Sequence, residues 1–404
     1  MVAHYFRHEY GRLVARLVRR FGVHELAAIE DSVQEAMVAA LDVWGPRGIP
    51  DRPSAWLHRA ARNALLDRTR TRDRRARILE ERDEPAPPEP VEARLGGEVD
   101  DELLRMLFVC CHEELPERSR LVLALKILCG FGTDEIAFRL FTTEANVYKR
   151  LARARDRLRA IGAAEPSGAT LRARLPDVRS VLYLLFNEGY LSIRADDAIR
   201  AELCAEAIRL TTIVATHPAV ADPTTAALLA LMHLHAARLG TRTDPAGDLV
   251  LLEEQDRSSW DRERLSTGME WLTVARGAER LTRFHLEAAI AAEHALAPSF
   301  AETDWGRIAR YHQQLAELDP SPIHALNRSV ALAEAEGPAA ALESLAEVVR
   351  PEWLRDHYLW DAVLADLHRR AGHTDQARVH RDAALDAAPS EAIARALDRR
   401  LFIG

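Results

Sequence analysis

The segment spanning residues 133–159 carries side chains suited to reading a nucleic acid. Ile136 and Ala137 share one face of a short predicted helix, and Val147 and Leu151 share one face of a longer one. Polar and basic residues lie at the start and on the free face of the second helix: Thr143, Asn146, Lys149, Arg150 and Arg153. Because amides bond to base edges and basic groups bond to phosphates, this pattern predicts a helix-turn-helix.

The turn of this motif is its least regular part. Phe141 holds the position that is Gly in many helix-turn-helix motifs, and its side chain could instead plug the small core of the domain. An ordinary amphipathic helical hairpin with a solvated basic face is the alternative explanation of the whole segment.

A second segment predicts a surface for single-stranded nucleic acid. Nine arginines and only two acids lie between residues 52 and 77, on a helix expected to start at Ser54. Guanidinium groups bind a backbone, while an aromatic and an amide group such as Trp56 and Asn63 suit unpaired bases. A solvated arginine-rich helix explains the same composition.

Acidic and amide side chains gather on one face of an earlier helix. Asp31, Gln34 and Glu35 are spaced i, i+3, i+4, opposite the apolar Val33 and Met37. This face is either a docking patch for a basic partner helix or the hydrophilic side of a bundle.

The remaining polar residues predict no enzyme, metal or cofactor. Cys110 and Cys111 lack a second Cys or His cluster at metal-ligand spacing, and His368, His373 and His380 are expected to be scattered and solvated. No P-loop, GxGxxG or nucleophile elbow is present in the sequence. We therefore expect no catalytic residue, no metal and no cofactor.

The elements that position these residues are all predicted to be helices. Residues 1–80 form one helical domain, with a loop marked by Gly45, Pro46, Gly48, Pro50 and Pro53. Residues 81–102 form an acidic, proline-rich flexible linker, and residues 103–162 form the helix-turn-helix domain.

Asn187 to Tyr190 predict a helix end with Gly189 as its cap, or the lining of a ligand or contact pocket.

The last segment, residues 176–404, is predicted to be a series of helices broken at prolines and glycines. Small residues recur near its end at the spacing of TPR-like helix pairs. The two pairs carry Ser329, Leu332, Ala341 and Leu345, and then Ala365, Gly372, Ala377, Ala384 and Pro389. An irregular helical domain is the alternative.

Charge is distributed unevenly along the chain. The net charge of −8 contrasts with two basic segments, residues 1–79 at +6 and residues 117–159 at +5. They are separated by an acidic segment at residues 80–102, with −8, and followed by residues 160–404, with −10. Because salt screens charges within about 10 Å, the local basic segments matter more for nucleic-acid binding than the total. With few cysteines and no apolar run of about 20 residues, we expect a cytoplasmic protein that does not enter a membrane.

Taken together, these segments resemble an extracytoplasmic-function sigma factor of RNA polymerase. The string DSVQEAMVAALDVW resembles the part of sigma region 2 that docks on the clamp helices of the polymerase largest subunit. The resemblance therefore implies that Asp31, Gln34 and Glu35 contact core polymerase.

The resemblance also implies two promoter-reading sites. AWLHRAARNALLDRTR resembles the part of region 2 that melts and reads the −10 element as a single strand. The residues implied there are Trp56, Arg59, Arg62, Asn63, Asp67 and Arg68. The helix-turn-helix resembles region 4, which reads the −35 duplex and contacts the polymerase flap, through Thr143, Asn146, Lys149, Arg150 and Arg153.

Strings such as VLYLLFNEGY and ALNRSVALAEAEGPAAAL narrow the resemblance to the subgroup with a long C-terminal TPR-like extension. In that subgroup the extension is thought to control activity, and we expect it to contact the sigma domains within the same chain. A different class of protein stays open: a TPR-like scaffold whose helix-turn-helix binds DNA or protein without polymerase.

Overall fold

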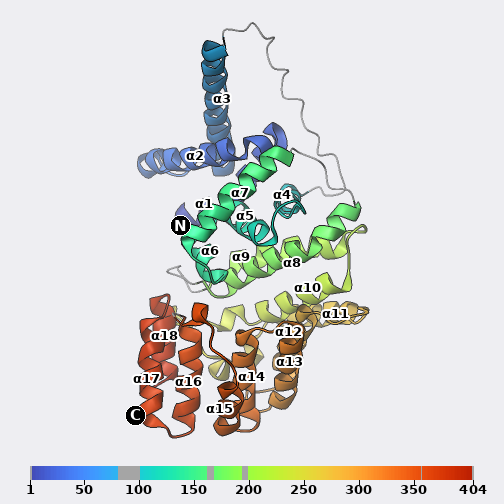
Figure 1. Cartoon of the computed structure of the whole chain (residues 1–404), viewed down its shortest axis with the longest axis vertical. Helices are drawn as coiled ribbons and strands as arrows, with labels where there is room; N and C mark the ends of the chain where they lie inside the picture. Colours follow the sequence, from blue (N-terminus) through green and yellow to red (C-terminus); the bar gives the residue numbers. More distant parts are fainter. Residues whose placement is uncertain (1, 81–100, 162–167, 193–198, 356, 403–404) are drawn as a thin grey trace. The chain divides into compact units, whose positions relative to one another are not determined.

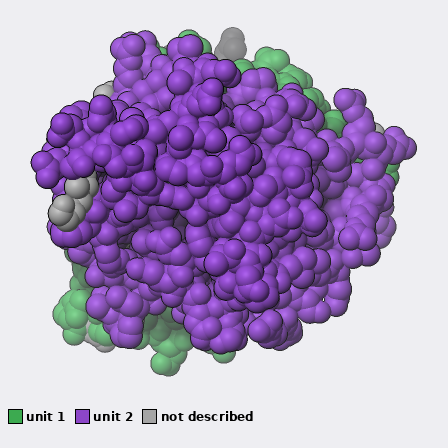
Figure 2. All heavy atoms as spheres, turned by 90° about the horizontal axis from the view of Figure 1, so that it is seen from below, with its two compact units in different colours: residues 1–181 green, residues 182–404 purple. Residues whose placement is uncertain are grey.

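The computed structural model describes residues 2–80, 101–161, 168–192, 199–355 and 357–402. These residues form 18 α-helices and short 3₁₀ turns, with no strand beyond one isolated bridge between Thr243 and Leu249. The predicted all-α fold class is confirmed. The chain divides into two compact units, residues 1–181 and residues 182–404 (Figure 2).

Seven helices and the first half of an eighth build the first unit (Figure 1). They are α1 (Val2–Phe21), α2 (Leu26–Arg47), α3 (Pro53–Glu80), α4 (Glu102–Cys110), α5 (Glu117–Cys129), α6 (Thr133–Arg139), α7 (Glu144–Ile161) and α8 (Gly168–Tyr190). Helix α1 packs on α2 and α3 and also on α4 and α5, so it belongs to both halves of the core.

The close packing of α1 on α5 depends on a glycine. A Cβ atom added to Gly11 would lie 2.3 Å from the carbonyl oxygen of Leu128. The surrounding side chains of α1, including Leu13, Val14 and Leu17, are almost completely buried. Any larger residue at position 11 must therefore push α5 away from α1.

Two helix boundaries differ from the sequence prediction. Helix α2 continues through Gly45 and Pro46 to Arg47, where a loop had been predicted. Gly48 ends it with a positive φ of 81°, and its N–H bonds to the carbonyl of Trp44. Helix α3 begins at Pro53, since proline is well tolerated in the first turn, where its missing N–H has no helical partner.

The helix-turn-helix is confirmed as α6 and α7, with Ile136, Ala137, Val147 and Leu151 buried between them. Phe141 does not plug the core. It adopts the left-handed conformation, with φ of 48°, and its side chain is 39% exposed. The backbone of the turn therefore has the left-handed conformation that usually requires Gly, although the residue there is Phe.

The acidic linker predicted for residues 81–102 lies outside the described residues up to position 100. Of its last two residues, Glu102 is the first residue of α4 and Asp101 lies directly before that helix. The Asp101 side chain accepts a hydrogen bond of 2.9 Å from the N–H of Leu104, which makes it the N-cap of that helix.

The second unit continues α8 and adds ten further helices within the described residues. They are α9 (Ala201–Thr216), α10 (Pro223–Ala236), α11 (Arg262–Ala275), α12 (Arg283–Leu296), α13 (Trp305–Leu318), α14 (Pro322–Ala335), α15 (Pro338–Ala346), α16 (Tyr358–Arg370), α17 (Thr374–Asp386) and α18 (Glu391–Arg400). The predicted helix breaks fall between two of these helices, at Pro218, Pro245, Pro298, Pro320, Gly337, Gly372 and Pro389.

The small residues of the predicted repeats lie where paired helices touch. Ala341 is fully buried between α14 and α15, and Ala377 and Ala384 are fully buried on α17. Gly372, with φ of 77°, lies in the turn between α16 and α17. These two helices lie side by side (Figure 1). The TPR-like helix pairs are therefore present as predicted.

Gly189 has a different role from the predicted helix cap. Helix α8 runs one residue past it, and a Cβ at Gly189 would lie 2.8 Å from the carbonyl oxygen of Arg200 and 2.7 Å from the amide of Cys204. The glycine allows α9 to approach α8. The adjoining Glu188 is completely buried and accepts a hydrogen bond of 2.7 Å from Ser192.

Candidate nucleic-acid interface

The free face of α7 presents most of the predicted duplex-reading residues to solvent. Asn146, Lys149 and Arg153 are exposed, and Arg150 is half-buried. Thr143 is also exposed, and its hydroxyl accepts a hydrogen bond of 3.3 Å from the N–H of Asn146. Thr143 thus caps the helix as well as lying beside the proposed DNA face.

Tyr148 belongs to the same face, and the sequence reasoning missed it. Its side chain is 60% exposed, and its hydroxyl lies 3.3 Å from that of Thr133 on α6. The sequence could have predicted this exposure. Tyr148 directly follows the buried Val147, so its ring lies on a side of the helix turned away from the core.

The predicted acidic docking face is also exposed, but part of it is occupied. Asp31, Gln34 and Glu35 line α2, and the guanidinium of Arg68 on α3 bridges Asp31 at 3.2 Å and Glu35 at 3.0 Å. All three paired side chains are about half exposed, so each ion pair contributes under about 1 kcal/mol. The acidic face is therefore partly occupied by a solvent-exposed pair of salt bridges between α2 and α3.

The remaining predicted strand-binding residues are spread around α3. Arg59, Asn63 and Asp67 are exposed, whereas Arg62 is half-buried. Trp56 packs edge-on against the buried Trp44, with ring centroids 5.5 Å apart. The structure therefore groups Arg68 with the α2 acids and places Trp56 at the border of the core.

Comparisons with known proteins agree with this arrangement. Residues 6–75 match the model of Sigma-70 region 2, residues 105–158 match that of Sigma-70 region 4, and residues 174–276 match a family of unknown function, DUF6596. The RNA polymerase sigma factor NccH of Alcaligenes xylosoxydans xylosoxydans is 31% identical over 161 residues, covering 38% of this chain and 82% of the relative.

The chain belongs to the sigma-70 family. An uncharacterized protein of Rhizobium meliloti (strain 1021), R00370, is 34% identical over 385 residues, covering 91% of this chain and 88% of the relative. No solved structure matches this chain. The sigma factor has region 2 in α1 to α3, region 4 in α4 to α7, and a C-terminal extension, as the extracytoplasmic-function resemblance implied.

Regions 2 and 4 of the sigma factor are joined by a buried ionic cluster. Arg155 of α7 donates two hydrogen bonds to Glu30 of α2, at 2.9 and 2.8 Å, and the Tyr10 hydroxyl of α1 donates a third at 3.2 Å. Glu30 is 3% exposed. Sequence reasoning missed this cluster, although Glu30 lies beside the core residue Ile29 and so carries a charge close to the buried side of its helix.

The pKa shifts in this cluster reflect the balance of burial and pairing. Burial and then the Glu30 carboxylate raise the pKa of the Tyr10 hydroxyl far above its ordinary value. For Arg155, burial alone would lower the pKa, but the hydrogen bond to Glu30 and its charge outweigh burial and raise it.

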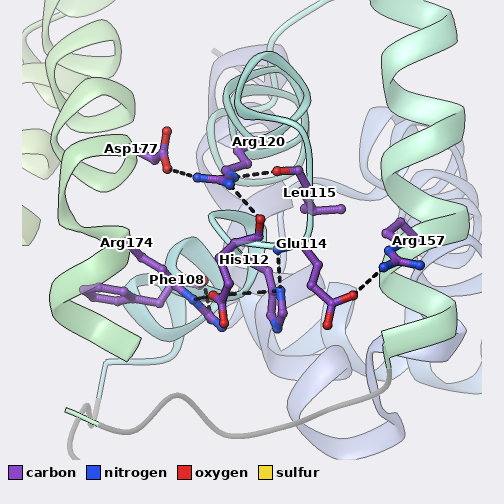
Figure 3. Close-up of polar contacts among 9 residues, drawn as sticks. Phe108, His112, Glu114, Leu115, Arg120, Arg157, Arg174 and Asp177 are labelled. Atoms are coloured by element: carbon purple, nitrogen blue, oxygen red, sulfur yellow. Dashed lines mark hydrogen bonds and ion pairs between the residues drawn. The ribbon is translucent and has the colours of Figure 1, made fainter. Parts of the chain in front are cut away.

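The extension of the sigma factor begins on region 4 (Figure 3). Arg174 of α8, only 3% exposed, donates to Glu113 at 2.7 Å and to the carbonyl of Phe108 at 2.9 Å. One helical turn on, Asp177 accepts from Arg120 of α5 at 2.6 Å. The Arg174 guanidinium lowers the pKa of Glu113 by hydrogen bonding. The first half of α8 is thus fixed to the α4–α5 corner.

Metal-binding groups do not converge in the described part of the sigma factor, where no set of three or more candidate ligands has suitable geometry. The histidines expected to be scattered are nevertheless neighbours: the Nδ1 atoms of His368 and His373 are 3.1 Å apart, and His380 stacks on His368 and bonds to Asp361.

The four cysteines are buried as free thiols, and burial raises the pKa of Cys110 and Cys111. None of the described helices is long and apolar enough to span a membrane.

Proposed function

We propose that this sigma factor binds core RNA polymerase and directs initiation at specific promoters, with its C-terminal extension regulating that activity. The observation that carries the proposal is the exposed face of Asp31, Gln34 and Glu35 on region 2. A helix-turn-helix regulator that acts without polymerase has no need of such a face. Catalysis would belong to the polymerase, and the chain would act beside it in the cytoplasm.

Each part of the promoter has a proposed reader. The α7 face of Asn146, Lys149, Arg150 and Arg153, capped by Thr143, would enter the major groove of the −35 duplex. On α3, the residues proposed to bind the unpaired −10 strand are Trp56, Arg59, Arg62, Asn63, Asp67 and Arg68. We propose that region 4 binds the flap region of the polymerase. Region 2 would bind the clamp helices of the largest polymerase subunit.

The salt-bridged acids make core binding directly testable. In co-purification with core polymerase, Asp31→Arg and Glu35→Arg should each weaken retention at least about tenfold, because each places a positive charge before a basic partner. These exposed residues contribute little to stability, so the variants should fold. Asp51→Arg, the same charge change at an exposed position outside α2, is the control.

Run-off transcription from promoter DNA supplies the second measurement. Core polymerase with the wild-type chain should give a discrete transcript, and Lys149→Ala with Arg153→Ala should reduce it without loss of core binding. Wild-type levels of core retention in both α2 variants, or no promoter-dependent transcript, would exclude the sigma-factor activity for this chain.

The regulatory part of the proposal is supported by α8, which joins the extension to region 4 through Arg174 and Asp177. Removal of the chain after residue 165 should therefore change the amount of transcript, since region 4 loses a packed helix. Unchanged transcription by the truncated chain, at equal core binding, would count against a regulatory role.

A further inference from the structure

A pocket of about 310 Å³ lies in the second unit, between α9, the end of α10 and the start of α11. Helix α10 packs on both α9 and α11, and the N–H of Asp261 bonds to the carbonyl of Ala237 at 2.9 Å. Small-molecule sites usually have volumes of about 300–1,000 Å³, so the pocket has the size of a small one. All of its lining residues fall within residues 174–276, the part of the chain that matches DUF6596.

Small residues leave the mouth of this pocket open. Ala201 and Ala205 are exposed and lie one turn apart on α9, and Gly240 is exposed in the short turn after α10. A Cβ atom added to Gly240 would meet no atom within 4 Å. Because none of these residues has a side chain longer than a methyl group, a ligand can enter between them.

The floor of the pocket is apolar. Cys204, Ala236 and Ala237 are almost completely buried, and Ile208 is 8% exposed. Burial raises the pKa of the Cys204 thiol to about 12, which favours the neutral thiol, and its hydrogen bonds to the carbonyl of Phe186 at 3.5 Å. These side chains therefore offer a ligand apolar contact rather than a hydrogen bond.

Polar side chains lie at one end of the pocket, at the start of α11 and just before it. They are those of Ser259, Asp261 and Arg264. The Ser259 hydroxyl already donates to Asp256 at 3.0 Å. The Arg264 guanidinium is 37% exposed, and its Nε lies 3.5 Å from Asp261, the carboxylate with which it pairs within the described residues. A guanidinium binds a carboxylate best through two parallel N–H···O bonds, so Arg264 keeps donors for a second acceptor.

The charges around the floor favour an anion. Besides burial, the charges that act on the Cys204 thiol are those of Arg242, Glu202 and Arg264, so two of the three are positive. Arg242 is buried, with its guanidinium 3.6 Å from the centroid of the Tyr190 ring. A cationic field in a largely apolar site raises the local concentration of anions.

His233 adds a polar group beside the pocket. It precedes Ala236 and Ala237 by three and four residues, so it lies on the same face of α10. Its buried Nδ1 atom has no hydrogen-bond partner among the described residues. After burial, the charges of Arg264 and Asp261 are the causes of its lowered pKa, which places it near the polar end.

We propose that this pocket binds a small organic acid, whose carboxylate pairs with Arg264 and whose apolar body lies against Cys204, Ile208 and the alanines of α10. A cation would be repelled by Arg264 and Arg242. A polyol would leave hydroxyl groups unpaired against the apolar floor, at a cost in free energy. The inference goes beyond the proposed function, since it gives the part of the chain that matches DUF6596 a ligand of its own.

Calorimetric titration of the full chain with octanoate, 1-octanol and octylammonium tests this site. The three probes share one alkyl chain and differ in the charge of the head group. Octanoate should bind at least about tenfold more tightly than 1-octanol, because charge-assisted hydrogen bonds add to the same apolar contact. Octylammonium should bind more weakly than either. Undetectable binding of octanoate, or equal binding of octanoate and octylammonium, would overturn the proposal.

Two independent variants locate the binding site. Arg264→Gln should weaken octanoate binding about tenfold and leave 1-octanol binding unchanged. Ala205→Leu should narrow the mouth and weaken the binding of both probes, and the fold should tolerate it because Ala205 is exposed. The matched controls are Arg262→Gln on α11 and Ala339→Leu on α15, both at exposed positions outside the pocket lining. Both controls should bind octanoate as the parent does.

Peptide hydrogen exchange shows whether α9, α10 and α11 remain folded in each variant, and octanoate should slow exchange at the start of α11 in the parent. If the helices stay protected and both pocket variants bind octanoate like the parent, the ligand lies elsewhere and the proposal fails. If Arg264→Gln unfolds α11, the two probes with Ala205→Leu still decide. These measurements need no polymerase, so their outcome is independent of the proposed sigma-factor activity.

Discussion

Ion pairs join distant segments in both compact units, as Arg395 and Asp248 do in the second, but the two units differ in the groups that are buried in their cores. In the first unit, long-range arginine–carboxylate pairs such as Arg155–Glu30 and Arg120–Asp177 join segments far apart in sequence. In the second, partly buried histidines lie among apolar helices, and small residues such as Ala377 let consecutive helices pack closely. Breaking one partner of a buried ion pair leaves the other charge without compensation, whereas stacked helix pairs depend on the burial of apolar side chains.

The largest expected difference between the units is their response to acid. Burial lowers the pKa of His233 and His312 to about 4 and that of His235 and His294 to about 3. The unfolded chain binds these protons first, so the stability of the second unit should fall by several kcal/mol as the pH drops from about 6.5 toward 4. Hydrogen exchange of peptides from each unit, measured at both pH values, follows the two units separately.

The residue His235 sharpens this test. Its ring contacts that of Tyr190 at 5.0 Å, so His235→Phe keeps an aromatic ring there and should reduce the acid sensitivity of the second unit. His24→Phe, at a side chain 59% exposed in the first unit, should change nothing. Equal protection of both units at pH 4 would contradict the comparison.

Loss of the Arg174 contacts that hold α8 against region 4 should have the next largest effect on stability. This effect should be confined to the first unit. Arg174→Ala leaves the Phe108 carbonyl without its donor and removes a buried side chain, which should cost about 2–3 kcal/mol of unfolding free energy. Arg157→Ala, which removes a half-exposed pair, should cost less than about 1 kcal/mol. Denaturant titration followed by unit-resolved exchange gives both values, and equal losses would show that burial does not govern these pairs.

A buried carboxyl group in the second unit should affect stability less than the histidines do. It should also act in the opposite direction, because it lowers stability as the pH rises. Burial raises the pKa of Glu287 to about 7, despite the nearby Arg283 charge. The folded chain therefore binds the extra proton between about pH 4.5 and 7, and stability is lost as the pH rises through that range. Glu287→Gln should stabilise the second unit by about 2 kcal/mol at pH 8 and hardly at all at pH 4.5; a pH-independent gain would show that the carboxyl does not titrate there.

The smallest effect is expected at the helix-turn-helix turn. Phe141 is strained at φ of 48°, a conformation that costs most residues about 1–2 kcal/mol, and glycine avoids that strain while raising the entropy of the unfolded chain. Phe141→Gly should therefore stabilise α6 and α7 by only about 0.5 kcal/mol, measured by thermal unfolding of the first unit. A clear loss of stability would mean that the partly exposed ring makes contacts worth more than the strain.

Much of the fold was predictable because helix periodicity and helix breakers are local properties. The positions of Ile136, Val147 and Leu151 predicted α6 and α7, and prolines and glycines predicted the breaks of the second unit. The failures were local as well. Gly45 and Pro46 were predicted as loop, but α2 continues through both residues to Arg47, although the proline removes one helical hydrogen bond.

The sequence predicted which helix faces of the candidate site are exposed. It did not predict which side chains contact one another there. Charge and spacing identified the exposed faces of α2 and α7, whose roles toward polymerase and promoter DNA stay predictions. Nothing in the local pattern placed Arg68 on Asp31, or separated Arg155 from the arginines around it. Arginine is abundant in this chain, and side-chain chemistry alone does not distinguish a DNA contact from an internal ion pair.

The sequence by itself determined the helices, their breaks and the two basic segments, because each depends on residues within a few turns of one another. Only the tertiary structure decided that Glu30 is buried against Arg155, that Gly11 and Gly189 serve close helix contacts, and that α8 is anchored to region 4. These contacts join residues from about 10 to 125 positions apart. Their energies come from burial and charge pairing across the folded chain, which no local pattern encodes.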